Sequence, residues 1–179
     1  MKLNVFVLIA MVAILMGCKA DVSAPNLGFQ TPQEDTSYPK FLFQDIQGTV
    51  YGQPWSIQSG VVRLFGNGPK KEIIMYSEVP ANPCSKTFVA TKPFVSYVLP
   101  ENFTTDDYRT DINAPNGNDA AVFINLQAAD KNIFAEKTRI VVNAINSVDM
   151  SISFFAKGSD DPSAISEVNG IYIVKFCPN

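Results

Sequence analysis

The chain has 179 residues, of which 46% are hydrophobic, and its 14 basic and 17 acidic side chains give a formal net charge of −3 at pH 7. Charges of both signs are scattered without a basic block, which argues against nucleic-acid binding by phosphate neutralisation and against a basic face drawn to anionic lipid. The chain contains no histidine, which excludes Ser-His-Asp and Cys-His catalysis and the zinc sites that need that ligand.

Residues 1–17 have the composition of an export signal. Lys2 precedes an apolar run over residues 5–16, which is shorter than the roughly 20 residues that a membrane-spanning helix needs. The run leads into the motif Leu15, Met16, Gly17, Cys18. This motif resembles the cleavage site of bacterial lipoproteins, although Met16 stands where the family more often has a smaller residue. The resemblance implies cleavage before Cys18 and lipidation of Cys18; the alternative is an ordinary secretory signal with a cysteine near the cut.

A lipidated Cys18 would tie the mature protein to a membrane. Two or more acyl chains on one cysteine hold a protein durably, whereas a single chain binds only marginally. In Gram-negative lipoproteins an aspartate after the cysteine favours the inner membrane, and here Lys19 takes that place. The resemblance therefore implies a protein anchored to the bacterial outer membrane, on its periplasmic face or at the cell surface.

Residues 18–40 have the composition of a linker. Pro25, Pro32 and Pro39 are spaced by seven, and bulky apolar residues are few, so the segment cannot bury enough surface to offset its ordering entropy. We expect a flexible tether that averages about 25 Å from end to end as a coil. The alternative is a partner-binding segment with Phe29 and Tyr38 as anchors.

Residues 41–179 suffice for a single domain with its own core. Short runs rich in β-branched and aromatic residues alternate with turn residues, and no long amphipathic helix pattern is present. The turn at residues 66–68, Gly-Asn-Gly, predicts a tight hairpin, and a second hairpin is expected at residues 146–148. A short helix is expected within 101–119 or 128–136. The predicted strands are 46–51, 55–65, 71–79, 87–90, 94–99, 121–127, 138–146, 149–157 and 170–176.

This strand pattern predicts an all-β fold, an antiparallel β-sandwich of about nine strands, with a lipocalin-like β-barrel as the alternative. The run Gly48, Val50, Gly52, Trp55 follows a G-x-V-x-G-x-x-W pattern. It is similar to the opening strand and turn of small secreted bacterial β-domains, a resemblance that implies no particular activity. We expect Trp55 to pack as the largest side chain of the core.

Two cysteines remain beyond the motif at Cys18. An exported protein meets an oxidising compartment, so we expect Cys84 and Cys177 to form a disulfide. The alternatives are a redox-active pair or metal ligands, but a CxxC spacing and a histidine are both missing. The bridge would attach the end of the chain to the first third of the domain.

The polar segment 101–119 interrupts the strand pattern. Its carboxylates suit calcium, which takes oxygen ligands, and the calcium candidates are Asp106, Asp107, Asp111 and Asp119. The spacing does not fit an EF-hand, because Asn116 and Val122 stand where that loop needs glycine and glutamate. A solvated loop is the simpler interpretation.

The sequence favours a protein that acts by binding and is not an enzyme, with no cofactor. The expected function is that of a membrane-anchored envelope lipoprotein whose partner is another envelope protein or a glycan. One alternative is a carrier of an apolar ligand inside a barrel. Another is a hydrolase that uses Asp106, Asp107 and Asp111 in a concave pocket with raised carboxyl pKa values. Four aromatic side chains are expected in the core, with a stacking surface for glycans as the alternative: Phe94, Tyr97, Phe103 and Tyr108.

Overall fold

The computed structural model describes residues 36–85, 90–111, 120–125, 132–159 and 164–178. Cys18 and most of the predicted linker lie outside these ranges. Within them the fold is all β, as expected, and no helix is present. The strands are β1 (Gln47–Val50), β2 (Gln53–Ser56), β3 (Ser59–Leu64), β4 (Lys71–Tyr76), β5 (Phe94–Val98), β6 (Asp107–Asp111), β7 (Val122–Ile124), β8 (Ile133–Phe134), β9 (Lys137–Ile145), β10 (Asp149–Gly158) and β11 (Ser166–Phe176).

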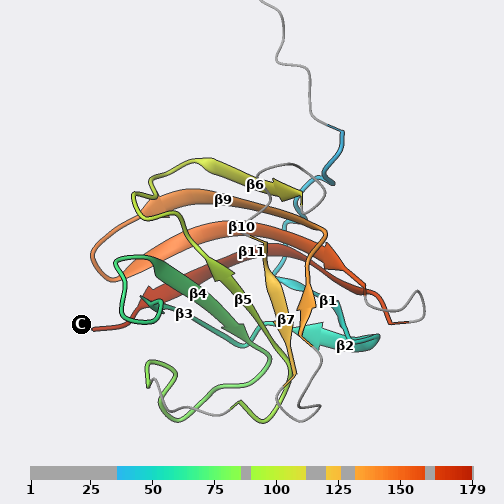
Figure 1. Ribbon diagram of the computed structural model, residues 1–179, viewed down its shortest axis with the longest axis horizontal. Coiled ribbons are helices and arrows are strands. Elements are labelled where there is room, and N and C mark those ends of the chain that lie inside the picture. Colours follow the sequence, from blue (N-terminus) through green and yellow to red (C-terminus); the bar gives the residue numbers. More distant parts are fainter. Residues whose placement is uncertain (1–35, 86–89, 112–119, 126–131, 160–163, 179) are drawn as a thin grey trace, which may run out of the picture. The chain divides into compact units, whose positions relative to one another are not determined.

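The strands form one 11-stranded sheet in the order β6-β9-β10-β11-β3-β4-β5-β7-β8, with β1 paired to β11 and to β2. The sheet curls strongly into a half-barrel (Figure 1). Most neighbours are antiparallel, but β11 and β3 run parallel, with Lys175 opposite Val61. The predicted antiparallel sandwich is therefore corrected to a single, mixed, curled sheet.

β11 is the strand that makes the sheet mixed. One of its sides pairs with β10 along ten consecutive positions, from Asp149–Lys175 to Gly158–Ser166. Its other side pairs first with β1, where Gln47 lies opposite Asn169, and then with β3 at its far end. β1 and β3 pair with the same side of β11 at different positions along it. β11 therefore connects the β1–β2 hairpin to the layer formed by β3, β4 and β5.

The local predictions differ from the structure where the chain makes long-range hydrogen bonds. The predicted strand 55–65 is two strands, because Ile57 donates to the Ile46 carbonyl at 2.9 Å and Gln58 donates to the Tyr76 carbonyl at 2.8 Å. β6 lies inside the predicted loop 101–119, and β8 lies inside the predicted helix 128–136. Both hairpins are confirmed, at residues 66–68 and 146–148. Most of the predicted strand 87–90 lies outside the described residues, and Ala90 is not in a strand.

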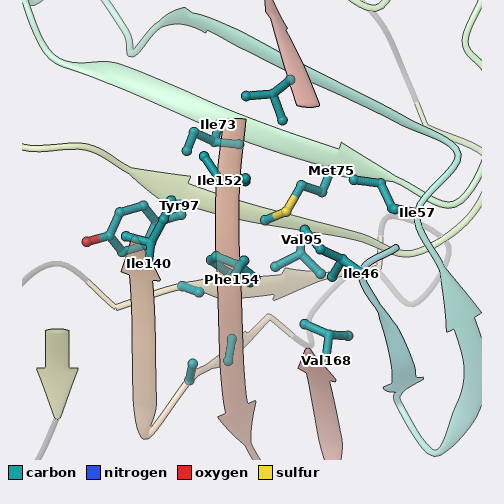
Figure 2. Close-up of a cluster of buried hydrophobic side chains, with 14 of the residues drawn as sticks. Ile46, Ile57, Ile73, Met75, Val95, Tyr97, Ile140, Ile152, Phe154 and Val168 are labelled. Carbon is teal, nitrogen blue, oxygen red and sulfur yellow. The ribbon is translucent and has the colours of Figure 1, made fainter. Parts of the chain in front are cut away.

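The inside of the curl is filled by apolar side chains from all parts of the sheet. Figure 2 labels ten of these side chains. Those of β4 and β5 point toward those of β9, β10 and β11, and Ile46 and Ile57, which flank the β1–β2 hairpin, join them. Tyr97 and Phe154 meet edge to face with ring centroids 6.3 Å apart, and both are buried. Trp55 is also buried, as predicted, and its indole N–H donates to the Pro93 carbonyl at 2.9 Å. A ligand inside the half-barrel would have to displace these side chains.

A second, smaller cluster covers the opposite face of β3–β5. Because side chains alternate along a strand, Ile73 and Met75 point into the main core, while Ile74 and Tyr76 point to the other face. There the Tyr76 ring lies 5.6 Å from the ring of Phe94. Residues of the segment between β4 and β5 pack on this face, so the layer β3–β5 is buried on both sides.

The packed unit begins at Thr36, a few residues before the predicted start at residue 41. The Tyr38 ring lies 5.6 Å from the Arg109 guanidinium on β6 and 5.9 Å from the Lys137 ammonium on β9. The Phe41 ring lies 4.7 Å from the Arg139 guanidinium. Residues 36–41 therefore contact the outer face of β6 and β9, and they belong to the domain.

Candidate functional site

A groove of about 630 Å³ opens at one end of the half-barrel, between the β3–β4 hairpin and the β9–β10 hairpin. The end of β11 holds the two hairpins together. The Phe176 N–H donates to the Val148 carbonyl at 2.8 Å, and the Cys177 N–H donates to the Val62 carbonyl at 2.8 Å. The lining residues are Val62, Arg63, Leu64, Lys71, Cys84, Phe103, Ile145, Asn146, Ser147, Phe176, Cys177 and Pro178.

Apolar side chains make up much of the groove wall. Phe103 and Phe176 are partly buried and pack against the main core, so they form a fixed base. Leu64 and Ile145, at the ends of β3 and β9, each remain 40% exposed. The groove therefore offers apolar surface that the fold itself leaves uncovered.

Two cations line the same groove, and they differ in how they are held. The Lys71 ammonium lies 4.9 Å from the centre of the Phe176 ring. Arg63 is held by the Glu72 carboxylate at 3.3 Å and by the Ser85 carbonyl at 3.2 Å. Glu72 also accepts a hydrogen bond from the Ser96 hydroxyl, at 2.5 Å. The groove is therefore an apolar surface with two cations at its edge. Such a surface is suited to binding a partner.

The disulfide between Cys84 and Cys177 forms one side of the groove, and the structure has the pairing that the sequence predicts. It attaches the segment between β4 and β5 to the end of β11. Glu78 joins the two ends of this segment between β4 and β5. Its carboxylate accepts hydrogen bonds from the Thr91 amide at 2.7 Å, from the Thr91 hydroxyl, and from the Lys92 amide at 3.3 Å. The Thr91 hydroxyl is the main cause that lowers the pKa of the Glu78 carboxyl.

Three of the acidic residues proposed for calcium or hydrolysis, Asp106, Asp107 and Asp111, lie on β6 or just before it, and none of them lines this groove. Asp107 pairs with Arg109 at 2.7 Å and with Arg139 at 3.0 Å. Partial burial raises the pKa of the Asp107 carboxyl, but the hydrogen bonds and charges of the two arginines outweigh this effect and lower the pKa. The neighbouring Asp106 carboxylate accepts a hydrogen bond from the Asp107 amide at 2.8 Å. These contacts give both carboxylates structural partners on the protein.

The structure therefore offers little to the hydrolase hypothesis, which required carboxyl groups with raised pKa values in a concave pocket. Asp107 has a lowered pKa, and Asp111 ends β6 opposite Lys137. Asp119 lies outside the described residues, so the calcium hypothesis stays a prediction. In the described ranges, no three side chains of the types His, Cys, Asp and Glu are grouped so as to hold a metal ion.

The aromatic residues considered for glycan stacking do not form one exposed surface. Tyr97 is 2% exposed in the main core, and Phe94 packs in the second cluster. The Tyr108 hydroxyl accepts a hydrogen bond from the Thr104 amide at 2.7 Å and donates one to the Thr104 carbonyl at 3.1 Å. Phe103 is the member of this set that lines the groove. All four rings pack in or against one of the two core clusters, which is the expectation from the sequence, and Phe103 lines the groove as well.

The sequence analysis did not identify the groove. Its wall needs Leu64 from one hairpin and Ile145 from another, and these residues are far apart in the chain. The available signal was the placement of Leu64, Phe65, Ile145 and Val148 next to predicted hairpin turns, where polar residues are usual.

No protein-family model matches this chain, and no curated protein or solved structure is similar to it at a significant level. In the part of the chain that the structure describes, no helix has the length and apolar character needed to span a membrane.

Proposed function

We propose that the protein is a lipid-anchored component of the bacterial outer membrane whose β-domain binds a partner in the envelope without catalysing a reaction. The lipid anchor rests on the sequence motif that ends in Cys18. The binding role rests on one observation, the uncovered groove between the β3–β4 and β9–β10 hairpins. Proteins bind partners and ligands through concave, mostly apolar surfaces with a few polar groups, and this groove has that composition.

Binding is favoured over catalysis by the chemistry of the side chains that line the groove. Lys71 lies against an aromatic ring, and Arg63 is already paired with Glu72. The arginine-paired Asp107 belongs to β6 and does not line the groove. A carrier that holds its ligand inside the barrel is less favoured, because Tyr97, Phe154 and their neighbours fill the inside of the curl.

The anchor can be tested on the protein purified from membranes of its host. Mass spectrometry should find a chain that starts at Cys18 and carries fatty acyl groups on that residue. A Cys18→Ser variant should lose the acyl groups and should no longer sediment with membranes. An unmodified cysteine, or a leader still attached to the native protein, would remove the anchor from the proposal.

The groove can be tested with a photo-crosslinking amino acid at Ser147, which lines the groove and is exposed. Illumination of living cells should give a discrete adduct with an envelope component. A matched probe at Gln53, an exposed position on β2, serves as the control and should give none. Equal adducts at both positions, or none at Ser147, would contradict binding at the groove.

A further inference from the structure

Exposed apolar side chains gather at the end of the half-barrel that carries the groove. Leu64 and Phe65 lie at the tip of the β3–β4 hairpin and are 40% and 47% exposed. Ile145 and Val148 lie at the tip of the β9–β10 hairpin and are 40% and 62% exposed. We call these four residues the tip surface, and we propose that it docks on a phospholipid bilayer that contains anionic lipid. This inference rests on the proposed function for its setting, the membrane that holds Cys18.

The two hairpins reach the same end of the molecule, as Figure 1 shows for the β3–β4 and β9–β10 turns. Phe176 fixes the relative position of the two hairpins, because it pairs with Val62 of β3 and donates its N–H to the Val148 carbonyl. Leu64 and Ile145 also line one groove. Leu64 and Ile145 therefore share one surface, and Phe65 and Val148 lie at the tips of the same two hairpins, which the end of β11 holds together.

Lysines stand next to the apolar residues of each hairpin. Lys71 is the cross-strand partner of Leu64, and the Lys70 carbonyl accepts a hydrogen bond from the Phe65 amide. Lys175 of β11 is exposed beside the β9–β10 hairpin. Lysine side chains at the edge of an apolar surface can extend their ammonium groups to the lipid headgroups while their stems remain with the apolar residues. Each lysine near an anionic membrane contributes to attraction.

Two of the acidic groups at this end are engaged by protein partners. Glu72 is engaged by Arg63 and Ser96. Asp149, opposite Lys175, accepts a hydrogen bond from the Asn146 side chain at 2.5 Å. Glu101 follows β5, and Asp106 precedes β6, where its carbonyl accepts a hydrogen bond from the Val142 amide of β9. The three lysines and Arg63 thus supply four cations beside the apolar residues of the two hairpins, although the whole chain has a net charge of −3.

The tether has the length that docking requires. Residues 19–35 separate Cys18 from the packed unit, and a chain of that length spans at most about 60 Å. Tyr38 lies beside Lys137 at the start of β9, whereas the tip surface lies at the end of that 9-residue strand, about 30 Å away. A lipid anchor at Cys18 and the tip surface can therefore contact the same bilayer.

The experiment uses the chain from Lys19 onward, which contains the whole packed unit with its core and disulfide. Without Cys18, vesicle binding reports on the tip surface and not on the lipid anchor. We expect the protein to sediment with vesicles of phosphatidylethanolamine and phosphatidylglycerol, and to sediment less at high salt. The double variant Phe65→Ser/Val148→Ser should bind about tenfold more weakly. It lacks two apolar side chains that the parent transfers from water into the bilayer.

A matched control replaces two exposed apolar residues away from the two hairpins, Phe43→Ser/Phe134→Ser, which are 97% and 58% exposed in the parent. The control should bind like the parent, and Lys70→Gln/Lys175→Gln should reduce binding only to vesicles with anionic lipid. The proposal is overturned if the parent does not sediment with the vesicles, or if the tip-surface variant and the control variant lose binding equally. It is also overturned if monomeric short-chain phospholipid binds one-to-one while vesicles do not, because the groove would then be a ligand site. None of these outcomes bears on the acylation of Cys18.

Discussion

The hydroxyl of Tyr51 donates a hydrogen bond of 2.8 Å to the main-chain carbonyl of Phe123, which lies 72 residues later in the chain. Tyr51 belongs to the turn between β1 and β2 and has a φ of 54°, in the left-handed region that L-residues other than glycine rarely adopt. Its amide donates to the Ser166 hydroxyl at 2.9 Å. The residue thus joins the β1–β2 hairpin both to β11 and to β7.

Tyr51→Phe should lower the free energy of unfolding by about 1 kcal/mol, because the variant loses this hydrogen bond and leaves the Phe123 carbonyl without that donor. The measurement is urea unfolding followed by the fluorescence of Trp55. Tyr172→Phe is the control, since the Tyr172 hydroxyl donates to the exposed Gln58 carbonyl at 3.2 Å, where water can replace it. Equal losses in the two variants would show that the bond to Phe123 does not contribute in this way.

Gly170→Ala should destabilise the fold by about 2 kcal/mol, because the site has no room for a side chain. A Cβ there would lie 2.6 Å from the Gln44 carbonyl oxygen and 2.7 Å from the Ile46 backbone, and Gly170 has a φ of 154°. Gly68→Ala is the matched control, because the nearest atom would be 3.9 Å away. Thermal unfolding measured by circular dichroism should show a clear loss for Gly170→Ala and almost none for Gly68→Ala. The reverse order would contradict the close approach of Ile46 to β11.

Removal of the disulfide with Cys84→Ser/Cys177→Ser should cost about 2 to 4 kcal/mol of stability. The bridge joins residues separated by 93 positions, so the unfolded chain gains much freedom when it is absent. Chemical unfolding of the parent, with and without a reducing agent, is the comparison. The reduced parent should match the double variant, and a parent that is unaffected by reduction would contradict the prediction.

Asp107→Asn should change how stability depends on pH. The pKa of the Asp107 carboxyl in the folded protein is lowered from the ordinary value of 3.8, so its ionised form stabilises the fold above that value. This contribution is lost as pH falls through the lower, folded pKa. The parent should exceed the variant by at most about 1 kcal/mol at neutral pH, because the groups are partly exposed. Unfolding measured from pH 7 down to pH 2 should show this difference shrink below about pH 4.

Arg139→Gln provides a second check on the same ion pairs. It removes one of the two cations that hold Asp107, so it should also reduce the excess stability at neutral pH. A difference between parent and Asp107→Asn that stays constant over the whole pH range would contradict the ion-pair explanation.

The sequence predicts the hairpins well because their signals are local. Gly66 has a φ of 58°, as its place in a Gly-Asn-Gly turn suggests, and β3 and β4 pair on either side of it. Alternating apolar residues likewise predict β9 and β10, whose ladder continues from the turn at Asn146. In such elements one segment of chain contains both the turn and the partner strand, so nothing distant is needed to define them.

The elements that were missed depend on partners far away in the chain. β6 contains the residues Asp107, Tyr108, Arg109, Thr110 and Asp111, which look like a solvated loop. It is a strand because the edge of β9 offers backbone partners from Lys137 to Val141. The two-residue strand β8 exists for a similar reason, since its backbone pairs with β7. Weak local preference is overridden where a neighbouring edge supplies the hydrogen bonds.

The amino-acid sequence by itself determined the all-β class, the two hairpins and the pair of cysteines, because these follow from turn geometry, side-chain alternation and the number of thiols. The tertiary structure alone decided that one mixed sheet replaces the expected sandwich, since the parallel contact between Lys175 and Val61 depends on where β1 and β3 meet the same side of β11. It also decided the groove, because Leu64 and Ile145 become neighbours only when the sheet curls. Local chemistry therefore defined the hairpins, and long-range pairing defined β6, β8 and the surface that the sheet presents.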